Sequence, residues 1–147
     1  MSAKNLETEY ENAHDSPGFL LWQLTNAWQS EQRKALAPFD LTHVQFVLLA
    51  VLVSTNNTGS VSQKELSMLA KTDIMMTSQV VRTLEKKGLV TRQKNASDKR
   101  AVQLQPTQKG TALASKAVQI VERVDKAFFK NLGADLPKFT HMMQLLT

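Results

Sequence analysis

The chain has 147 residues and a formal net charge of +5, and this length suffices for a single domain with a real hydrophobic core. It contains no cysteine, which excludes a disulfide framework, a thiolate zinc site and a thiol-based redox switch. The sequence lacks both an apolar run of about 18 residues and a secretory signal, so we expect a cytoplasmic protein with no membrane partner.

The first predicted helix begins at Ser16 and Pro17, where an N-cap residue precedes a proline at the first helical position. Apolar residues then recur at helical spacing until Pro38. Trp22 lies beside this stripe, so the helix has more apolar surface than one core contact requires, and the excess predicts a partner. Residues 1–15 show no such pattern, and we assign them no fixed role.

The second predicted helix opens with a capping box, in which the Thr42 side chain accepts from the backbone of Gln45 and the Gln45 side chain reaches back. Leu41 and Phe46 stand at the positions of a hydrophobic staple. Residues 46–53 are apolar on every side, which predicts a buried central helix. Their β-branched content leaves a strand as the alternative.

The next segment has the pattern of a helix-turn-helix. A loop-rich stretch at 54–60 leads to a second capping box, made by Ser62 and Glu65. A short helix follows, and a break at 72–73 precedes the next one. Two short helices joined by a tight turn, the second bearing a groove-facing stripe, are typical of this motif.

The helix expected within residues 72–87 has two different sides. Its apolar side comprises Ile74, Thr77, Val80, Val81 and Leu84. Its opposite side comprises Met75, Gln79, Arg82 and Lys86, flanked by Ser78 and Thr83. Gln and Arg form bidentate pairs with adenine and guanine, and Met can touch a thymine methyl group. The polar side is therefore either a DNA-reading face or an ordinary solvated helix face.

A basic hairpin is expected after this helix, which Gly88 ends. Residues 89–94 and 100–105 read as strands, joined by the turn-rich segment 95–99. The charged residues near the tip are Arg92, Lys94, Lys99, Arg100 and a single acid, Asp98. Such a tip can reach DNA phosphates or a narrow minor groove. A helix-turn-helix followed by this ribbon is a winged helix.

The positive charge is concentrated in one third of the chain. Residues 61–110 contain ten Lys and Arg against four acids, a net +6, whereas the rest has eight basic and nine acidic residues, a net −1. This distribution favours a polyanion-binding part at 41–106 joined to a neutral scaffold. A basic membrane-surface patch is the alternative, but these charges occupy helix, turn and hairpin instead of one amphipathic helix.

Two more helices are expected at the C-terminal end. A long one runs from the N-cap Thr107 to about Leu132, before Gly133, and the last begins near Asp135. Together with the first helix they have more apolar surface than a small winged domain can cover. Dimerisation helices are therefore predicted at 16–37 and 108–147.

The expected fold is a single domain over 1–147, mainly α with a small β-hairpin wing. It consists of a winged helix-turn-helix part and a helical dimerisation region, with about six helices in all. An enzyme is not expected, because the sequence shows no constellation of nucleophile, base or metal ligands. The histidines, His14, His43 and His141, are far apart and lack a second ligand at helical spacing, so neither a metal nor a cofactor is expected.

From about residue 16 to 147, the chain resembles the MarR family of bacterial transcriptional regulators. The matching motifs are Leu36-Ala37-Pro38, Leu41-Thr42-His43-Val44-Gln45-Phe46, Leu84-Glu85-Lys86-Lys87-Gly88-Leu89-Val90, Asp98-Lys99-Arg100 and Thr107-Gln108-Lys109-Gly110. The resemblance implies a homodimeric regulator, usually a repressor, that binds a short inverted repeat in double-stranded DNA and is commonly released by a small ligand. It also implies that Arg100 reaches the minor groove and that Asp98 orients it.

We therefore expect the helix at 72–87 in the major groove and the wing in the minor groove. The expected DNA-contacting residues are Met75, Met76, Thr77, Ser78, Gln79, Arg82, Lys86, Arg92, Lys94, Asp98, Lys99 and Arg100. Two positions depart from the family pattern. Gln79 stands where Arg is frequent, and Pro106 replaces a frequent Leu, which predicts an early end of its strand because proline has no N–H to donate.

Two alternatives stay open. The side chains of Trp22, Trp28, His43 and Phe46 are candidate walls of the small-ligand pocket that the resemblance implies, or they are ordinary core residues. A winged-helix module for protein interaction, without specific DNA binding, is the second candidate function.

Overall fold

The computed structural model describes residues 5–55, 59–94 and 102–147. Its helices are α1 (Pro17–Leu36), α2 (His43–Thr55), α3 (Gln63–Ala70), α4 (Ile74–Lys86), α5 (Gln108–Phe128) and α6 (Leu136–Leu146). Short 3-10 segments are η1 (Ala13–Asp15), η2 (Ala37–Phe39) and η4 (Lys130–Asp135). The strands are β1 (Val61–Ser62), β2 (Val90–Lys94) and β3 (Val102–Pro106). The predicted fold, mainly helical with a winged helix-turn-helix, is confirmed.

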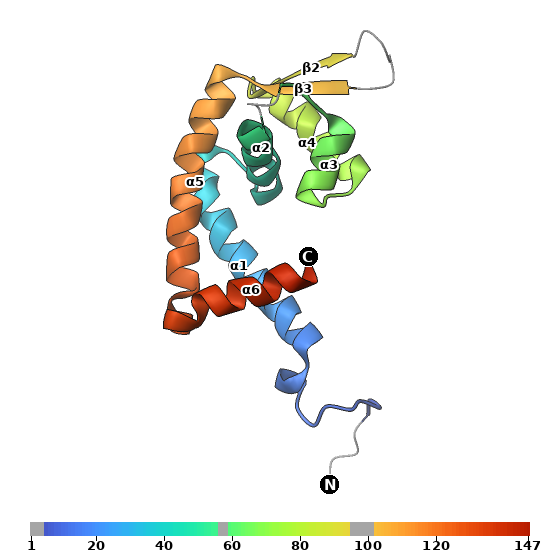
Figure 1. Ribbon diagram of the computed structural model, residues 1–147, viewed down its shortest axis with the longest axis vertical. Coiled ribbons are helices and arrows are strands. Elements are labelled where there is room, and N and C mark those ends of the chain that lie inside the picture. The colour runs from blue at the N-terminus through green and yellow to red at the C-terminus, as the bar shows by residue number, and fades with distance from the viewer. Residues whose placement is uncertain (1–4, 56–58, 95–101) are drawn as a thin grey trace.

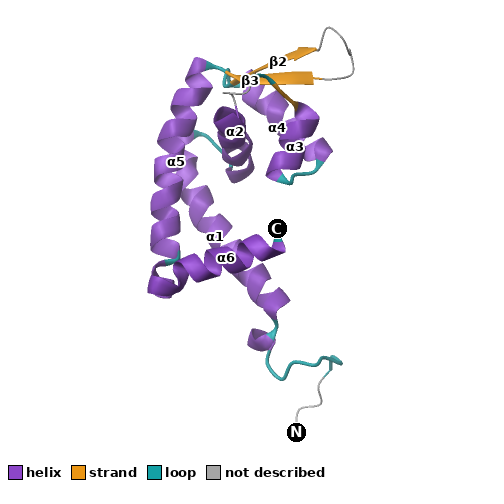
Figure 2. Cartoon of the chain, in the orientation of Figure 1, coloured by secondary structure: helices purple, strands orange, loops and turns teal. Residues whose placement is uncertain are grey.

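The winged part sits at one end of a long helical pair. Figure 1 shows α1 and α5 lying side by side, with α2, α3, α4 and the sheet gathered at one end. Figure 2 shows that strands β2 and β3 lie at this end. Helix α6 follows η4 at the far end of α5 and turns away from it. The long pair therefore carries the winged part and leaves α6 and the start of α1 for other contacts.

Helix α2 is the centre of the core, as its apolar composition predicts. Its start is closed by the capping box, since Gln45 N donates to Thr42 Oγ1 and Thr42 N donates to Gln45 Oε1, both at 3.2 Å. Leu48, Leu49 and Leu52 are almost completely buried. Burial of each such side chain contributes about 1.5–3 kcal/mol to stability, so this helix anchors the domain. The strand alternative for this segment is wrong.

Side-chain caps set the starts of α3 and α4. Ser62 Oγ accepts from Glu65 N at 3.0 Å, and Asp73 Oδ2 accepts from Met76 N at 3.1 Å. Between the two helices, Lys71 adopts a left-handed backbone conformation with φ 52°. These local signals produce the tight turn of the helix-turn-helix that the sequence predicts.

The wing has one strand more than predicted. Strand β1 pairs antiparallel with β3, with Val61 opposite Leu104, so the sheet has the order β1-β3-β2. The early end predicted for the last strand is also wrong, because β3 includes Pro106, which lies opposite Val90. Pro106 is the final residue of its strand, where a missing N–H is tolerated.

The C-terminal helices differ from prediction at one boundary. Helix α5 ends at Phe128 and not near Leu132, because the chain passes into the 3-10 segment η4. Within η4, Gly133 has φ 52° and ψ −126°, a combination that residues with a Cβ rarely adopt. Helix α6 then begins at Leu136, directly after Asp135, as expected.

A glycine cap ends α4. Gly88 has φ 74°, and its N–H donates to Glu85 O at 2.9 Å. Leu89 N donates to Leu84 O, also at 2.9 Å. This pair of hydrogen bonds is the Schellman motif, which satisfies carbonyls that the helix itself leaves free. The chain therefore leaves α4 in a defined direction into β2.

The first turn of α5 binds the end of α4. Thr107 Oγ1 donates to Gly88 O at 2.7 Å, and Thr107 N donates to Leu89 O at 3.0 Å. Lys109 Nζ donates to Lys87 O at 3.0 Å. Three consecutive carbonyls after α4 thus accept hydrogen bonds from the N-cap and the first turn of α5, which fixes one helix against the other.

This contact leads to a prediction about Gly110. A Cβ at Gly110 would lie 2.0 Å from Leu89 O, whereas a Cβ at Gly18, in the first turn of α1, would meet nothing within 4 Å. Gly110→Ala is expected to lower the free energy of unfolding by about 1–3 kcal/mol or more, because the backbone of Leu89 has to move. Gly18→Ala is expected to be neutral or stabilising by up to about 1 kcal/mol. Urea unfolding checks both, and equal effects would contradict the close packing.

Candidate nucleic-acid interface

Helix α4 presents the predicted polar side to solvent. Met75 is 73% exposed, and Gln79, Arg82 and Lys86 are exposed along the same face. The opposite side is held in the core by the buried residues Thr77, Val80, Val81 and Leu84. The prediction of Ile74 as an inward residue is wrong, since it is 59% exposed at the first position of the helix. The remaining apolar face fixes the rotation of α4 and hence the direction of the polar side.

Thr77 does not belong to the outward face. Its side chain is fully buried, and Oγ1 donates to Asp73 O at 2.8 Å and lies 2.7 Å from Thr72 Oγ1. The structure therefore removes Thr77 from the predicted DNA-contacting set, because its hydroxyl already has partners inside the helix-turn-helix. Its neighbours remain accessible, with Met76 exposed and Ser78 partly buried.

The wing is braced against α4. The Arg92 guanidinium is partly buried, and its Nε lies 3.6 Å from Glu85 Oε1 on α4. Arg92, predicted to contact DNA, is thus drawn toward the helix, whereas Lys94 is exposed near the end of β2. The other predicted wing residues, Asp98, Lys99 and Arg100, lie outside the residues that the structure describes.

A second cluster joins α1, α2 and α5. Trp28 Nε1 donates to Asp125 Oδ1 at 2.7 Å, and Gln32 Nε2 donates to the same oxygen at 2.8 Å. The rings of Trp28 and His43 meet edge to face, with centroids 4.8 Å apart. Gln32 is fully buried, and its Oε1 has no hydrogen-bond partner. The winged part and the long helices therefore meet at a polar site.

Of the four residues predicted to line a ligand pocket, the structure brings two together. Trp28 and His43 are brought together, but Phe46 lies in the hydrophobic core and Trp22 is 66% exposed on α1. Gln32 and Asp125 were missed, because their roles depend on α1 packing against α5 and no local spacing indicates them.

Burial affects the ionisation of His43. Desolvation lowers the pKa of His43, and the nearby Asp125 carboxylate opposes this effect by favouring the charged imidazole. His43 is the first residue of α2, so this titratable side chain lies where the winged part meets the long helices.

Exposed apolar side chains gather on α1 and α6. On α1 they include Leu21 and Trp22, and on α6 they include Met142, Leu145 and Leu146. Leu146 is 88% exposed at the end of the last helix. Apolar surface of this extent on two helices is typical of a protein interface.

The described residues contain neither a cluster of metal ligands nor a single helix that could span a membrane. Within 5–55, 59–94 and 102–147, no group of three or more His, Asp or Glu could hold a metal ion. No single helix there is long and apolar enough to cross a membrane, although Pro17–Phe39 and His43–Thr55, bent by 75°, reach that length and composition together.

The chain is similar to known regulators. The model of the MarR family matches residues 41–102. YdcH, an uncharacterized HTH-type transcriptional regulator of Bacillus subtilis, is 50% identical over 125 residues, which are 83% of this chain and 84% of the relative. The HTH-type transcriptional repressor Rv2887 of Mycobacterium tuberculosis is 31% identical over 136 residues, 91% of this chain and 96% of the relative.

The fold is similar to that of a solved protein–DNA complex. A mutant MarR from E. coli complexed with operator DNA has a TM-score of 0.77 and 25% sequence identity. The similarity covers 88% of this chain and 91% of that chain. It therefore extends well beyond the winged part.

The His43 site predicts a pH dependence of stability. Because the folded state lowers the pKa of His43, the unfolded chain binds more protons just below the ordinary histidine pKa. The free energy of unfolding is therefore expected to fall as pH decreases from about 7.5 to about 5.5, and His43→Gln is expected to flatten this fall. His14→Gln, at an exposed position of η1, is the matched control. Urea unfolding across this range checks it, and the same slope in all three proteins would contradict it.

Proposed function

Because the chain belongs to the MarR family of transcriptional regulators, we propose that it is a repressor that binds an inverted-repeat operator in double-stranded DNA as a homodimer. The family is one of transcriptional regulators and not of enzymes. The observation that carries the proposal is the exposed row Met75, Gln79, Arg82 and Lys86 on a helix whose opposite side is buried. Its residue types are those that read base edges and bind phosphates in a major groove.

The two parts that contact DNA have different roles. Helix α4 enters the major groove, where Gln79 and Arg82 meet base edges and Lys86 meets a phosphate. The wing, with Lys94 and the Asp98 to Arg100 segment predicted from sequence, reaches the minor groove and the backbone. Support comes from the exposure of the α4 face and from the related E. coli protein, which is complexed with operator DNA.

Dimerisation is the second part of the proposal. The exposed apolar residues on α1 and α6, such as Leu21 and Leu145, cover each other across a two-fold axis. A two-fold dimer presents two copies of α4, and an inverted repeat presents two equivalent half-sites to them. The symmetry of the protein would therefore be matched by the symmetry of the operator.

A small effector is the third part. We place its site where Trp28, Gln32 and His43 meet, between the winged part and the long helices. The support is a fully buried Gln32 whose carbonyl oxygen lacks a partner, beside an edge-to-face aromatic pair. A ligand with a hydrogen-bond donor and an apolar ring suits these groups, and its binding would change how α2 packs on α1 and α5.

The first prediction distinguishes the two DNA-contacting parts. Gln79→Ala or Arg82→Ala is expected to cost about 1–3 kcal/mol on the preferred site and to relax base preference at particular positions. Arg100→Ala is expected to lower affinity on all sites by similar factors, because minor-groove and phosphate contacts carry little sequence information. Affinities for a panel of single-base operator variants check this. The assignment fails if Arg100→Ala reshuffles base preference while the α4 variants leave it unchanged.

The second prediction concerns the dimer. At micromolar concentration the protein is expected to sediment as a dimer, and Leu145→Glu is expected to shift it toward monomer, because a charge would enter the apolar α6 surface. Leu69→Glu alters a comparably exposed leucine on α3 and is expected to leave the dimer intact. A monomeric wild-type protein at this concentration would overturn the proposed assembly.

A further inference from the structure

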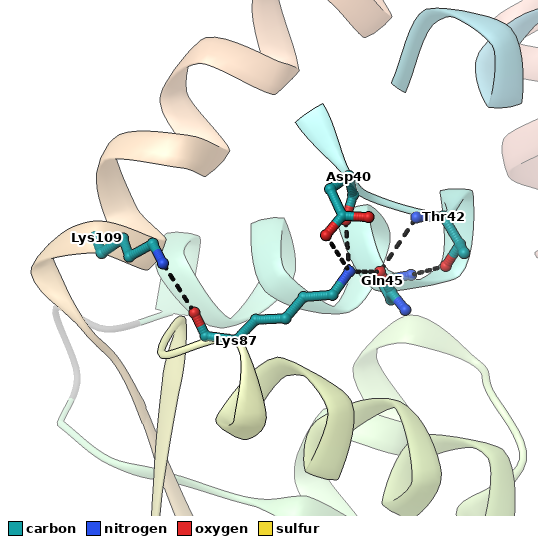
Figure 3. Close-up of polar contacts among 5 residues, drawn as sticks. All are labelled: Asp40, Thr42, Gln45, Lys87 and Lys109. Carbon is teal, nitrogen blue, oxygen red and sulfur yellow. Dashed lines mark hydrogen bonds and ion pairs between the residues drawn. The ribbon is translucent and has the colours of Figure 1, made fainter. Parts of the chain in front are cut away.

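Two adjacent lysines at the end of α4 have different surroundings. Lys86 is exposed, in line with the outward face of the helix. The Lys87 side chain instead turns back toward the segment that joins α1 to α2, as Figure 3 shows. Only 26% of the Lys87 side chain is exposed. In the sequence the two lysines contribute equally to the net positive charge. In the structure only Lys86 is exposed along the outward face of α4.

The Lys87 ammonium has three oxygen partners. Its Nζ donates to the backbone carbonyl of Asp40, donates to Gln45 Oε1 at 3.0 Å and lies 3.6 Å from Asp40 Oδ2. An ammonium group has three N–H donors, so these oxygens can use all of them. A phosphate could bind Lys87 only by displacing one of these partners.

The partners of Lys87 are themselves fixed. Gln45 Oε1 also accepts from Thr42 N at 3.2 Å, as part of the α2 capping box. Asp40 adopts a left-handed backbone conformation with φ 54°, and its N–H donates to Ala37 O at 3.0 Å. The ammonium is therefore held by the corner at the end of α1 and the start of α2, which the core anchors.

The backbone of Lys87 is held from the other side. Lys109 Nζ, in the first turn of α5, donates to Lys87 O at 3.0 Å (Figure 3). The same residue thus connects the end of α4 to the α1–α2 corner through its side chain and to α5 through its carbonyl. These are the helices that carry the winged part.

We infer that Lys87 is a positioning residue that sets the direction of α4 relative to the long helices, and that it does not itself bind DNA. This inference rests on the proposed operator binding. Helix α4 has 13 residues and is therefore about 20 Å long. A tilt of about 10° at its C-terminal end would move its first turn by roughly 3 Å, which is enough to break hydrogen bonds to base edges.

Loss of the Lys87 ammonium is expected to change the orientation of α4 more than the stability of the fold. The Asp40 side chain is 94% exposed, and ion pairs with such exposed groups contribute little to stability. The core of the winged part is made by apolar side chains, among which Val81, Leu84 and Leu89 are buried. Loss of the ammonium should therefore leave a folded protein whose two α4 helices no longer fit the two half-sites.

The test compares Lys87→Met with Lys86→Met in the full-length protein. The DNA is the best sequence selected from a random pool, together with versions that have one base pair added to or removed from the spacer between half-sites. Affinity is measured over a range of salt concentrations, and melting temperature confirms that each variant is folded. Methionine keeps most of the lysine stem and removes the charge, so the two variants differ only in position.

Lys86→Met is expected to reduce the steepness of the salt dependence, because a phosphate contact in each subunit is lost. Lys87→Met is expected to weaken operator binding by about tenfold or more with the wild-type salt slope, and to flatten or shift the preference for spacer length. If Lys87→Met only reduced the fraction of folded protein, the apparent affinity would fall by the same factor for operators of every spacer length.

Lys87→Arg provides a second variant in case methionine prevents folding. Arginine binds phosphate well but has a planar fork that cannot reproduce the three contacts of the ammonium. The inference predicts weaker operator binding and a changed spacer preference for Lys87→Arg, whereas a phosphate-binding role predicts wild-type binding.

A reduced salt slope for Lys87→Met, or an unchanged spacer profile in both Lys87 variants, would overturn the inference while operator binding stands. If the wild-type protein selects no sequence at all, the proposed function fails, and the inference fails with it.

Discussion

The structure depends on the hydrogen bonds that join the end of α4 to the first turn of α5. Carbonyls at and just after the end of a helix have no hydrogen-bond partner within that helix. Here the carbonyls of Lys87, Gly88 and Leu89 accept from Thr107 and Lys109. These bonds hold the C-terminal end of α4 against the longest helix of the chain, and the Lys87 side chain adds a separate contact to the α1–α2 corner.

The two faces of α4 have separate roles. Val81 and Leu84 hold the helix in the core, and the direction in which Gln79 and Arg82 point follows from that packing. The structure also separates basic residues that the net charge counts together. Arg92 is drawn toward Glu85 by an ion pair at 3.6 Å, although it counts toward the same basic patch as the exposed Lys94.

Local signals in the sequence predicted most of the helices and the α4 face. The caps made by Ser62 and Asp73 involve residues only three positions apart, so the sequence indicates them directly. Contacts between distant segments were not predictable in this way. Strand β1 exists because Val61 pairs with Leu104, and the Gln32 site exists because α1 packs against α5. Thr77 was assigned to both sides of α4, and only its burial shows that it belongs to the core.

The central claim is that two copies of the α4 face read an inverted repeat. Selection of bound sequences from a random DNA pool by the full-length protein tests it most directly. The account predicts enrichment of an inverted repeat whose half-sites are centred about one helical turn, roughly 10 base pairs, or a multiple of it, apart. Recovery of DNA with no enriched sequence, or of a single unrepeated motif, would contradict the account.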